Sequence, residues 1–228
     1  MQSNFELNLI EDLPALERID INGVRHYVDL DRTIYDPYPS VTTVLGADKS
    51  KEKSLANWRK RVGEEEANKI SRQAAMRGTD VHLMIEDYIL GQENQKKMMP
   101  NIVAMFKGLK EIADRSINNI RLVEGQIFSH HLRVAGTVDL VAEYEGKLSI
   151  IDWKTSRAPK KKEYIHNYFI QESAYAVMFE ERTKLPVDQL VTLLVHPEGT
   201  QVFVEKRDDW IGKFEKLREQ YDQLQSAS

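Results

Sequence analysis

Three short runs rich in β-branched and aliphatic residues follow one another in the middle of this 228-residue chain. They are RLVEGQIFS, AGTVDLVAEY and KLSIIDWKT, and Glu145-Gly146 between the last two is typical of a tight turn. Helix-like sequence precedes these runs. A helix-like stretch and two more strand-like runs, QLVTLLVH and TQVFVEK, follow them. This order predicts an α/β (α+β) domain in which a central mixed sheet is flanked by helices.

Helix-forming residues dominate the N-terminal half of the chain. They fill about 51–91, where Gly91 is the expected stop, and a second helix is expected over about 100–117. Ahead of them, the first 20 residues are expected to be loosely ordered, and INGVRHYVDL is expected to form a short hairpin that turns at Asn22-Gly23. Ser40 is expected to cap a short helix.

The chain is expected to be a single domain, because domains commonly hold about 100–200 residues. It divides into an extension over 1–37, a mainly helical part over 38–118 and a core of sheet and helices over 119–228. Within that core a helix is expected over about 163–183. An amphipathic helix ends the chain. Its apolar residues at helical spacing are expected to pack in the core, and they are Trp210, Phe214, Leu217, Tyr221 and Leu224.

Composition narrows the kinds of site that this chain can build. It contains no cysteine, which excludes disulfides, cysteine-bound zinc and iron–sulfur clusters. A metal would therefore need carboxylate, carbonyl or imidazole ligands, which favours Mg²⁺ or Mn²⁺. The formal net charge is -4, so nucleic acid would have to bind a local basic patch. The acidic N-terminus and the lack of a long apolar stretch predict a cytoplasmic protein with no targeting signal and no membrane partner.

Asp139 and Asp152 lie in the two strand-like runs on either side of the Glu145-Gly146 turn. A hairpin would bring their carboxylates together, and Lys154 shares strand parity with Asp152, so both side chains project from one face. Two carboxylates can hold one or two Mg²⁺ ions, and a lysine beside them can offset charge in a phosphoryl transition state. The alternative is a surface hairpin with a paired aspartate and lysine. The apolar run before Asp152 favours a divalent-metal nuclease centre.

Further polar residues are candidates for the same centre. His82 and Glu86 stand four residues apart on one helical face, where an imidazole and a carboxylate could complete a metal shell. Capping or packing is the alternative for His82. Gln171 and Tyr175 repeat that spacing and could reach nucleic acid or the surroundings of Lys154. Equally, Gln171 could be solvated and Tyr175 could be a core residue. Glu124 could be a ligand or an outer carboxylate, or could simply be exposed.

Two basic stretches are candidates for contacts with DNA phosphates. One follows the aspartate–lysine run. The other is a basic helix with an aromatic residue, which is typical of surfaces that stack bases and follow a phosphate backbone. A solvated loop and an ordinary amphipathic helix are the alternatives. The residues assigned to DNA binding are Trp58, Arg59, Arg61, Thr155, Ser156, Arg157, Lys160, Lys161 and Lys162.

These motifs resemble a known family. GTVD, IIDWKT and QESAY, in this order, resemble the PD-(D/E)xK nuclease pattern, and RGTDVH is similar to the helix that marks its RecB-like branch. PSVTTVL, NWRKR, RGTDVHLMIE and VAGTVDLVAEYEGKLSIIDWKTS resemble the single-stranded DNA exonucleases related to mitochondrial genome maintenance exonuclease. The similarity runs from about residue 38 to the C-terminus. It implies the PD-(D/E)xK fold and a Mg²⁺- or Mn²⁺-dependent exonuclease that degrades single-stranded DNA from a free end.

The resemblance also implies roles for individual residues. As metal ligands it implies His82, Asp139, Asp152 and the backbone carbonyl of Trp153. Lys154 would be the catalytic lysine, and Gln171 and Tyr175 the trailing motif residues. No mitochondrial presequence is visible, which favours a bacterial or phage source. The absence of cysteine separates the chain from RecB-like relatives that carry an iron–sulfur cluster.

The setting expected for such an enzyme is DNA recombination, repair, replication or degradation. We expect a monomer, which could work with a recombination or replication protein. Two alternatives stay open at this point. One is a structure-dependent endonuclease of the same superfamily, and the other is a non-catalytic DNA-binding module.

Overall fold

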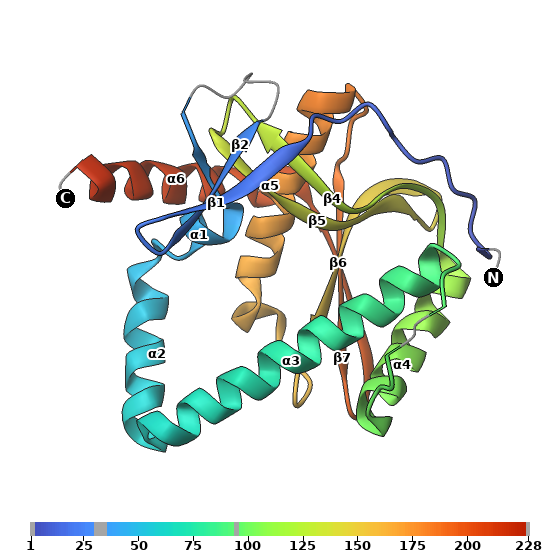
Figure 1. Ribbon diagram of the computed structural model, residues 1–228, viewed down its shortest axis with the longest axis horizontal. Coiled ribbons are helices and arrows are strands. Elements are labelled where there is room, and N and C mark those ends of the chain that lie inside the picture. The colour runs from blue at the N-terminus through green and yellow to red at the C-terminus, as the bar shows by residue number, and fades with distance from the viewer. Residues whose placement is uncertain (1–2, 30–35, 94–95, 227–228) are drawn as a thin grey trace.

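A computed structural model describes residues 3–29, 36–93 and 96–226 (Figure 1). Its main sheet has five strands in the order β4-β5-β6-β7-β8, and only β6 and β7 are parallel. The sheet is therefore mixed, as predicted. Its strands are β4 (Ile117–Ser129), β5 (Val134–Tyr144), β6 (Lys147–Thr155), β7 (Gln189–His196) and β8 (Gly199–Lys206).

Helices cover both faces of this sheet (Figure 1). α3 (Glu64–Ile89) and α4 (Pro100–Ser116) pack on one face. α5 (His166–Thr183) packs on the other, with α1 (Val41–Leu45) and α6 (Ile211–Ser226) beside it. Short 3-10 turns, η1 (Lys162–Tyr164) and η2 (Arg207–Asp209), precede α5 and α6. No helix in the described part of the chain is both long and apolar enough to cross a membrane.

Two apolar cores result from the alternation of side chains along β6. Ile150 joins the core under α5, α1 and α6, whereas Ile151 and Trp153 join the core under α3 and α4. Asp152 and Lys154 share parity with Ile150 and therefore project toward α5. Residues from α3 and from α5 can consequently reach β6 from opposite faces.

The N-terminal segment adds a small antiparallel sheet of β1 (Leu16–Ile21), β2 (Val24–Asp29) and β3 (Tyr38–Pro39). The predicted hairpin is confirmed, and Asn22 and Gly23 turn it with φ of 55° and 78°. The predicted cap of α1 is also confirmed, because Ser40 Oγ accepts the Thr43 N–H at 3.0 Å. The prediction of loose order over the first 20 residues was wrong for residues 3–20, and residues 1–2 lie outside the described residues. The segment ahead of β1 pairs with β4, where the Asn8 N–H donates to the Ile120 carbonyl at 2.8 Å.

The long helical stretch predicted over 51–91 is two helices, α2 (Lys49–Val62) and α3. Gly63 separates them with φ 87°, a conformation that other residues rarely adopt. Arg59 on α2 spans the break with a 2.5 Å ion pair to Glu64 and a 2.6 Å hydrogen bond to Asn68. α2 therefore turns away from the axis of α3 (Figure 1).

The C-terminal helix matches its prediction with one exception. Trp210, Phe214 and Tyr221 are buried, and Leu217 packs against the same core. Leu224 was predicted to face the core but is 38% exposed, because the last turn of α6 extends past the packed region.

Candidate metal centre

The backbone ladder between β5 and β6 ends at the pair Leu140–Ile151. β6 remains paired with β7 beyond this point, so β5 and β6 separate where Asp139 and Asp152 would be the next pair. Asp139 Oδ2 accepts the Trp153 N–H at 3.0 Å, in place of a backbone carbonyl. A side chain thus closes the end of the ladder, and both aspartates lie at the opening.

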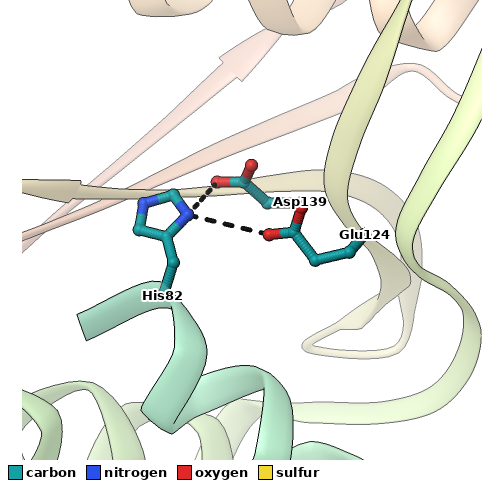
Figure 2. Close-up of side chains that lie close together, drawn as sticks. All are labelled: His82, Glu124 and Asp139. Atoms are coloured by element: carbon teal, nitrogen blue, oxygen red, sulfur yellow. Dashed lines mark ion pairs between the residues drawn. The ribbon is translucent and has the colours of Figure 1, made fainter. Parts of the chain in front are cut away.

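His82 reaches this opening from α3. Figure 2 shows its imidazole directed at the carboxylates of Asp139 and Glu124, which come from β5 and β4. The Nδ1 atom lies 3.5 Å from Asp139 Oδ2 and 3.7 Å from Glu124 Oε1. The Nε2 atom lies 2.7 Å from the Trp153 carbonyl oxygen. Both ring nitrogens therefore face acceptors, an arrangement that suits the protonated imidazole.

The charges around His82 favour that protonated form. Burial alone would lower the pKa of the imidazole. The carboxylates of Asp139, Glu124 and Asp152 together outweigh burial and raise the pKa of His82 to about 9. Before a cation binds, a proton on His82 thus offsets part of the negative charge of the cluster.

Glu124 owes its position to an unusual backbone. Its neighbours in β4 keep the register, with Val123 paired to Leu140 and Gly125 paired to Val138. Glu124 itself has φ 44°, in the left-handed region that non-glycine residues seldom occupy. Sequence reasoning left Glu124 open as a ligand, an outer carboxylate or an exposed residue. The structure brings Glu124 within ligand range of the same point as His82 and Asp139.

The residues at the opening fit a hard divalent cation. One ligand atom from each of His82, Glu124 and Asp139 lies within 4.8 Å of the others. The Trp153 carbonyl borders the same imidazole. Asp152 is only 2% exposed, and apart from Lys154 its oxygens have no hydrogen-bond partner among the described residues. Carboxylate and carbonyl oxygens with one imidazole suit Mg²⁺ or Mn²⁺.

Lys154 forms an ion pair with this otherwise unbonded Asp152 carboxylate. Its ammonium lies 5.2 Å from the ring centroid of Tyr168 on α5, within the range of a cation–π contact. Burial would lower the pKa of Lys154, but Asp152 and Asp139 together hold it above its ordinary value. Burial also raises the pKa of Asp152 to about 6, and the charge of Lys154 limits that rise. The lysine is therefore a fixed positive charge beside the cluster.

Gln171 and Tyr175 bond to each other rather than to Lys154. The Gln171 side-chain amide donates to the Tyr175 hydroxyl at 3.3 Å. A Cβ atom added to Gly136 would lie 2.9 Å from a ring carbon of Tyr175. The glycine of GTVD and the tyrosine of QESAY are thus a packing pair that brings α5 close to β5.

Glu86 lines an open pocket beside the cluster, with a volume of about 490 Å³ and with Gly78, His82 and Glu124 in its wall. Burial, and then the charge of Glu124, raises the pKa of Glu86. Glu86 thus lies beside the cluster, and the part in the metal shell that its spacing from His82 suggested stays a prediction.

The residues assigned to DNA binding lie in different surroundings. Arg59 is engaged by Glu64, Lys162 forms a 2.5 Å ion pair with Glu205, and Lys161 lies 4.0 Å from Glu163. Ser156 is buried, and its hydroxyl donates to the Ala158 carbonyl. Of the others, Arg61, Arg157 and Lys160 are exposed, whereas Trp58 and Thr155 are partly buried.

A family model described as the PD-(D/E)XK nuclease superfamily matches residues 50–227. The chain belongs to this superfamily. Its five-stranded mixed sheet with flanking helices is the PD-(D/E)XK nuclease fold, as the resemblance implied. The matched region contains all of the candidate ligands and Lys154.

Individual relatives of this PD-(D/E)XK protein share part of their length with it. Mitochondrial genome maintenance exonuclease 1 of Xenopus tropicalis is 27% identical over 210 residues, which cover 87% of this chain and 56% of the relative. The Homo sapiens protein of that name is 31% identical over 130 residues, which cover 54% and 38%. The chain thus spans about half the length, or less, of these curated relatives. A solved structure described as "Crystal structure of SSO0001" aligns with TM-score 0.38 and 15% identity over 75% of this chain and 70% of that one.

Two residues of this PD-(D/E)XK site were missed by sequence reasoning, namely Tyr168 and Glu172. Glu172 is fully buried on α5, where it accepts a hydrogen bond from the Thr192 hydroxyl, and its Oε2 has no partner among the described residues. Burial, and then the nearby charge of Asp152, raises the pKa of Glu172 well above its ordinary value. A signal was available, because helical spacing from the apolar Phe169 and Ala176 places Glu172 on the buried face of its helix.

Glu172→Gln tests whether this carboxyl is neutral in the folded protein. The unfolded chain ionises Glu172 at an ordinary pKa while the folded chain keeps the proton, so Glu172 lowers stability as pH rises above that pKa. We predict that the unfolding free energy of Glu172→Gln, minus that of wild type, increases by up to about 1.4 kcal/mol for each pH unit above about pH 5. Urea denaturation at several pH values measures it, with the exposed Glu219→Gln as control. A difference that stays constant with pH would contradict the prediction.

Proposed function

We propose that this protein is a Mg²⁺- or Mn²⁺-dependent exonuclease that hydrolyses phosphodiester bonds of single-stranded DNA from a free end. One observation carries the proposal. The cluster of His82, Glu124 and Asp139 meets the Asp152–Lys154 ion pair where β5 and β6 separate. Cation ligands and a fixed positive charge at one point are what phosphodiester hydrolysis requires.

Each residue has a distinct task in this proposal. His82, Glu124, Asp139, Asp152 and the Trp153 carbonyl would hold the cation. When bound, it supplies charge that polarises a phosphoryl oxygen and lowers the pKa of the attacking water. Lys154 keeps its proton and offers N–H donors to the phosphate oxygens as their negative charge grows. The Tyr168 ring supports its ammonium from the α5 side.

DNA as the substrate is supported by the frog and human relatives, whose names describe exonucleases of genome maintenance. The net charge of -4 confines DNA binding to local basic groups near the site. For the biological setting we propose DNA recombination, repair, replication or degradation.

A comparison of linear and closed substrates tests the need for a free end. We predict that single-stranded oligonucleotides labelled at the 5′ or the 3′ end are degraded with Mg²⁺ or Mn²⁺, while covalently closed single-stranded circles stay intact. The order in which labelled products appear gives the polarity. EDTA provides the metal-free control. Cleavage of circles would indicate an endonuclease instead, and binding without turnover in either metal would indicate a DNA-binding module.

A further inference from the structure

Two arginine side chains are linked across α3 and the end of β6. Arg77 Nε donates to the Thr155 hydroxyl at 3.3 Å, and Arg157 Nη2 donates to the Gln73 side-chain oxygen at 3.3 Å. Gln73 and Arg77 are one helical turn apart, and Thr155 and Arg157 are two residues apart. The two links therefore run side by side and bring the guanidinium groups near each other.

Neither of these guanidinium groups is neutralised within the part of the chain that the structure describes. Each is held by a neutral oxygen, and neither forms an ion pair with a described carboxylate. By contrast, Arg59, Arg182 and Arg207 each pair with a glutamate. Burial, and then the positive charge of Arg157, lowers the pKa of Arg77. Two adjacent cations with unused N–H donors are suited to a shared anion.

The arginine pair lies next to the candidate centre. Arg77 precedes His82 by five residues on α3, which is roughly 7.5 Å along the helix axis. Thr155, its partner, directly follows Lys154 on β6. An anion bound between the two arginines would therefore lie close to the cluster of His82, Glu124 and Asp139. Phosphate matches the planar, forked donors of arginine in shape and charge.

We propose that Arg77 and Arg157 together bind one internal phosphate of the substrate strand, next to the phosphate that is cut. The inference rests on the proposed function and deepens it. Holding the neighbouring phosphate fixes which phosphodiester bond lies beside Lys154, so the pair sets the register of cleavage. Arg77 belongs to neither basic stretch recognised in the sequence, and only the fold brings it beside Arg157.

Salt dependence of binding tests whether both arginines contact a single phosphate. Wild-type protein, Arg77→Gln, Arg157→Gln and the double variant are titrated with a fluorescent single-stranded oligonucleotide in EDTA. For single strands, each lost phosphate contact reduces the slope of log K against log salt by about 0.7. We expect that same reduction in both single variants and in the double variant. Arg115→Gln, at an exposed position, is the charge-matched control and should leave the slope unchanged.

Neutral linkages locate the phosphate along the strand. Oligonucleotides with one methylphosphonate at successive positions should show one internal position that weakens wild-type binding. That position should have no further effect in the double variant. Equal methylphosphonate effects in wild type and double variant, or unchanged slopes in both single variants, would overturn the proposal. The proposal would also be overturned if removing a terminal phosphate weakened binding to the same extent, because the arginines would then contact the strand end and not an internal phosphate.

These measurements need neither metal nor turnover. A protein that shows the arginine-dependent slope but never cuts DNA would reject the proposed function and leave the phosphate site standing. If the protein cuts DNA but the arginine variants leave the salt slopes unchanged, the proposed function would stand and the phosphate site would be rejected.

Discussion

Lys154→Met will lower the rate of DNA hydrolysis by about 10³-fold. The ammonium is held by Asp152 and backed by Tyr168, so it needs no reorganisation when charge develops on the phosphate. Methionine matches the apolar stem of lysine but lacks the ammonium group and its charge. Single-turnover cleavage of an end-labelled oligonucleotide measures the loss. The exposed Lys216→Met is the matched control and should cut at the wild-type rate.

Loss of folding could imitate this result, because removing Lys154 leaves the buried Asp152 carboxylate without its partner. Two measurements separate the effects. Circular dichroism and metal-free DNA binding should match wild type if only chemistry is lost. Asp152→Asn should lose activity to a similar extent, and the double variant should lose little more, since residues that act as a unit are not additive. Wild-type rates in both single variants would disprove the proposed centre.

Divalent-metal affinity will rise about tenfold per pH unit between about pH 6 and pH 8. The cause is the proton on His82, whose pKa the carboxylates raise to about 9. A cation can use the imidazole only after that proton leaves, so below the pKa proton competition weakens by a factor of ten with each unit that the pH rises. Mn²⁺ titration calorimetry in buffers of different ionisation enthalpy should show about one proton released per ion.

A non-titrating side chain at position 82 provides the control for that experiment. His82→Gln keeps a polar group facing Asp139 and Glu124 but cannot hold the proton. Its Mn²⁺ affinity should be weaker than that of wild type at high pH and should no longer rise tenfold with each pH unit. The stability of the metal-free protein depends on pH in the opposite direction. Its raised pKa lets His82 stabilise the fold fully at pH values below 6.5, the ordinary pKa of histidine, and this contribution to the free energy of unfolding is lost as the pH rises toward 9. A wild-type affinity that does not change with pH would refute the assignment.

The central hairpin could be predicted from sequence because its determinants are local. Glu145-Gly146 makes a two-residue turn with φ of 50° and 76°, which sets the register of β5 against β6. Asp139 and Asp152 must then face each other. Strand parity likewise assigns Lys154 to the face of Asp152. These inferences needed only the alternation of side chains and the length of the turn.

The opening of the ladder could not be predicted in this way. It depends on the Asp139 side chain taking the Trp153 N–H, a choice that no local pattern records. The entry of Glu124 into the cluster depends on one left-handed residue within an otherwise regular strand. Arg77 and Glu172 act through partners that lie 78 and 20 residues away in the chain. Such contacts follow from packing, which spacing alone does not contain.

The corner between α2 and α3 affects how experiments on the basic helix should be understood. Gly63 allows the backbone to turn there, and the ion pair of Arg59 with Glu64 and its hydrogen bond to Asn68 hold α2 at its angle to α3. Arg59 therefore fixes the orientation of α2 relative to α3 in addition to supplying a positive charge. Its removal would release the helix that carries Trp58 and Arg61, so weaker DNA binding in an Arg59 variant would not by itself count as a lost phosphate contact.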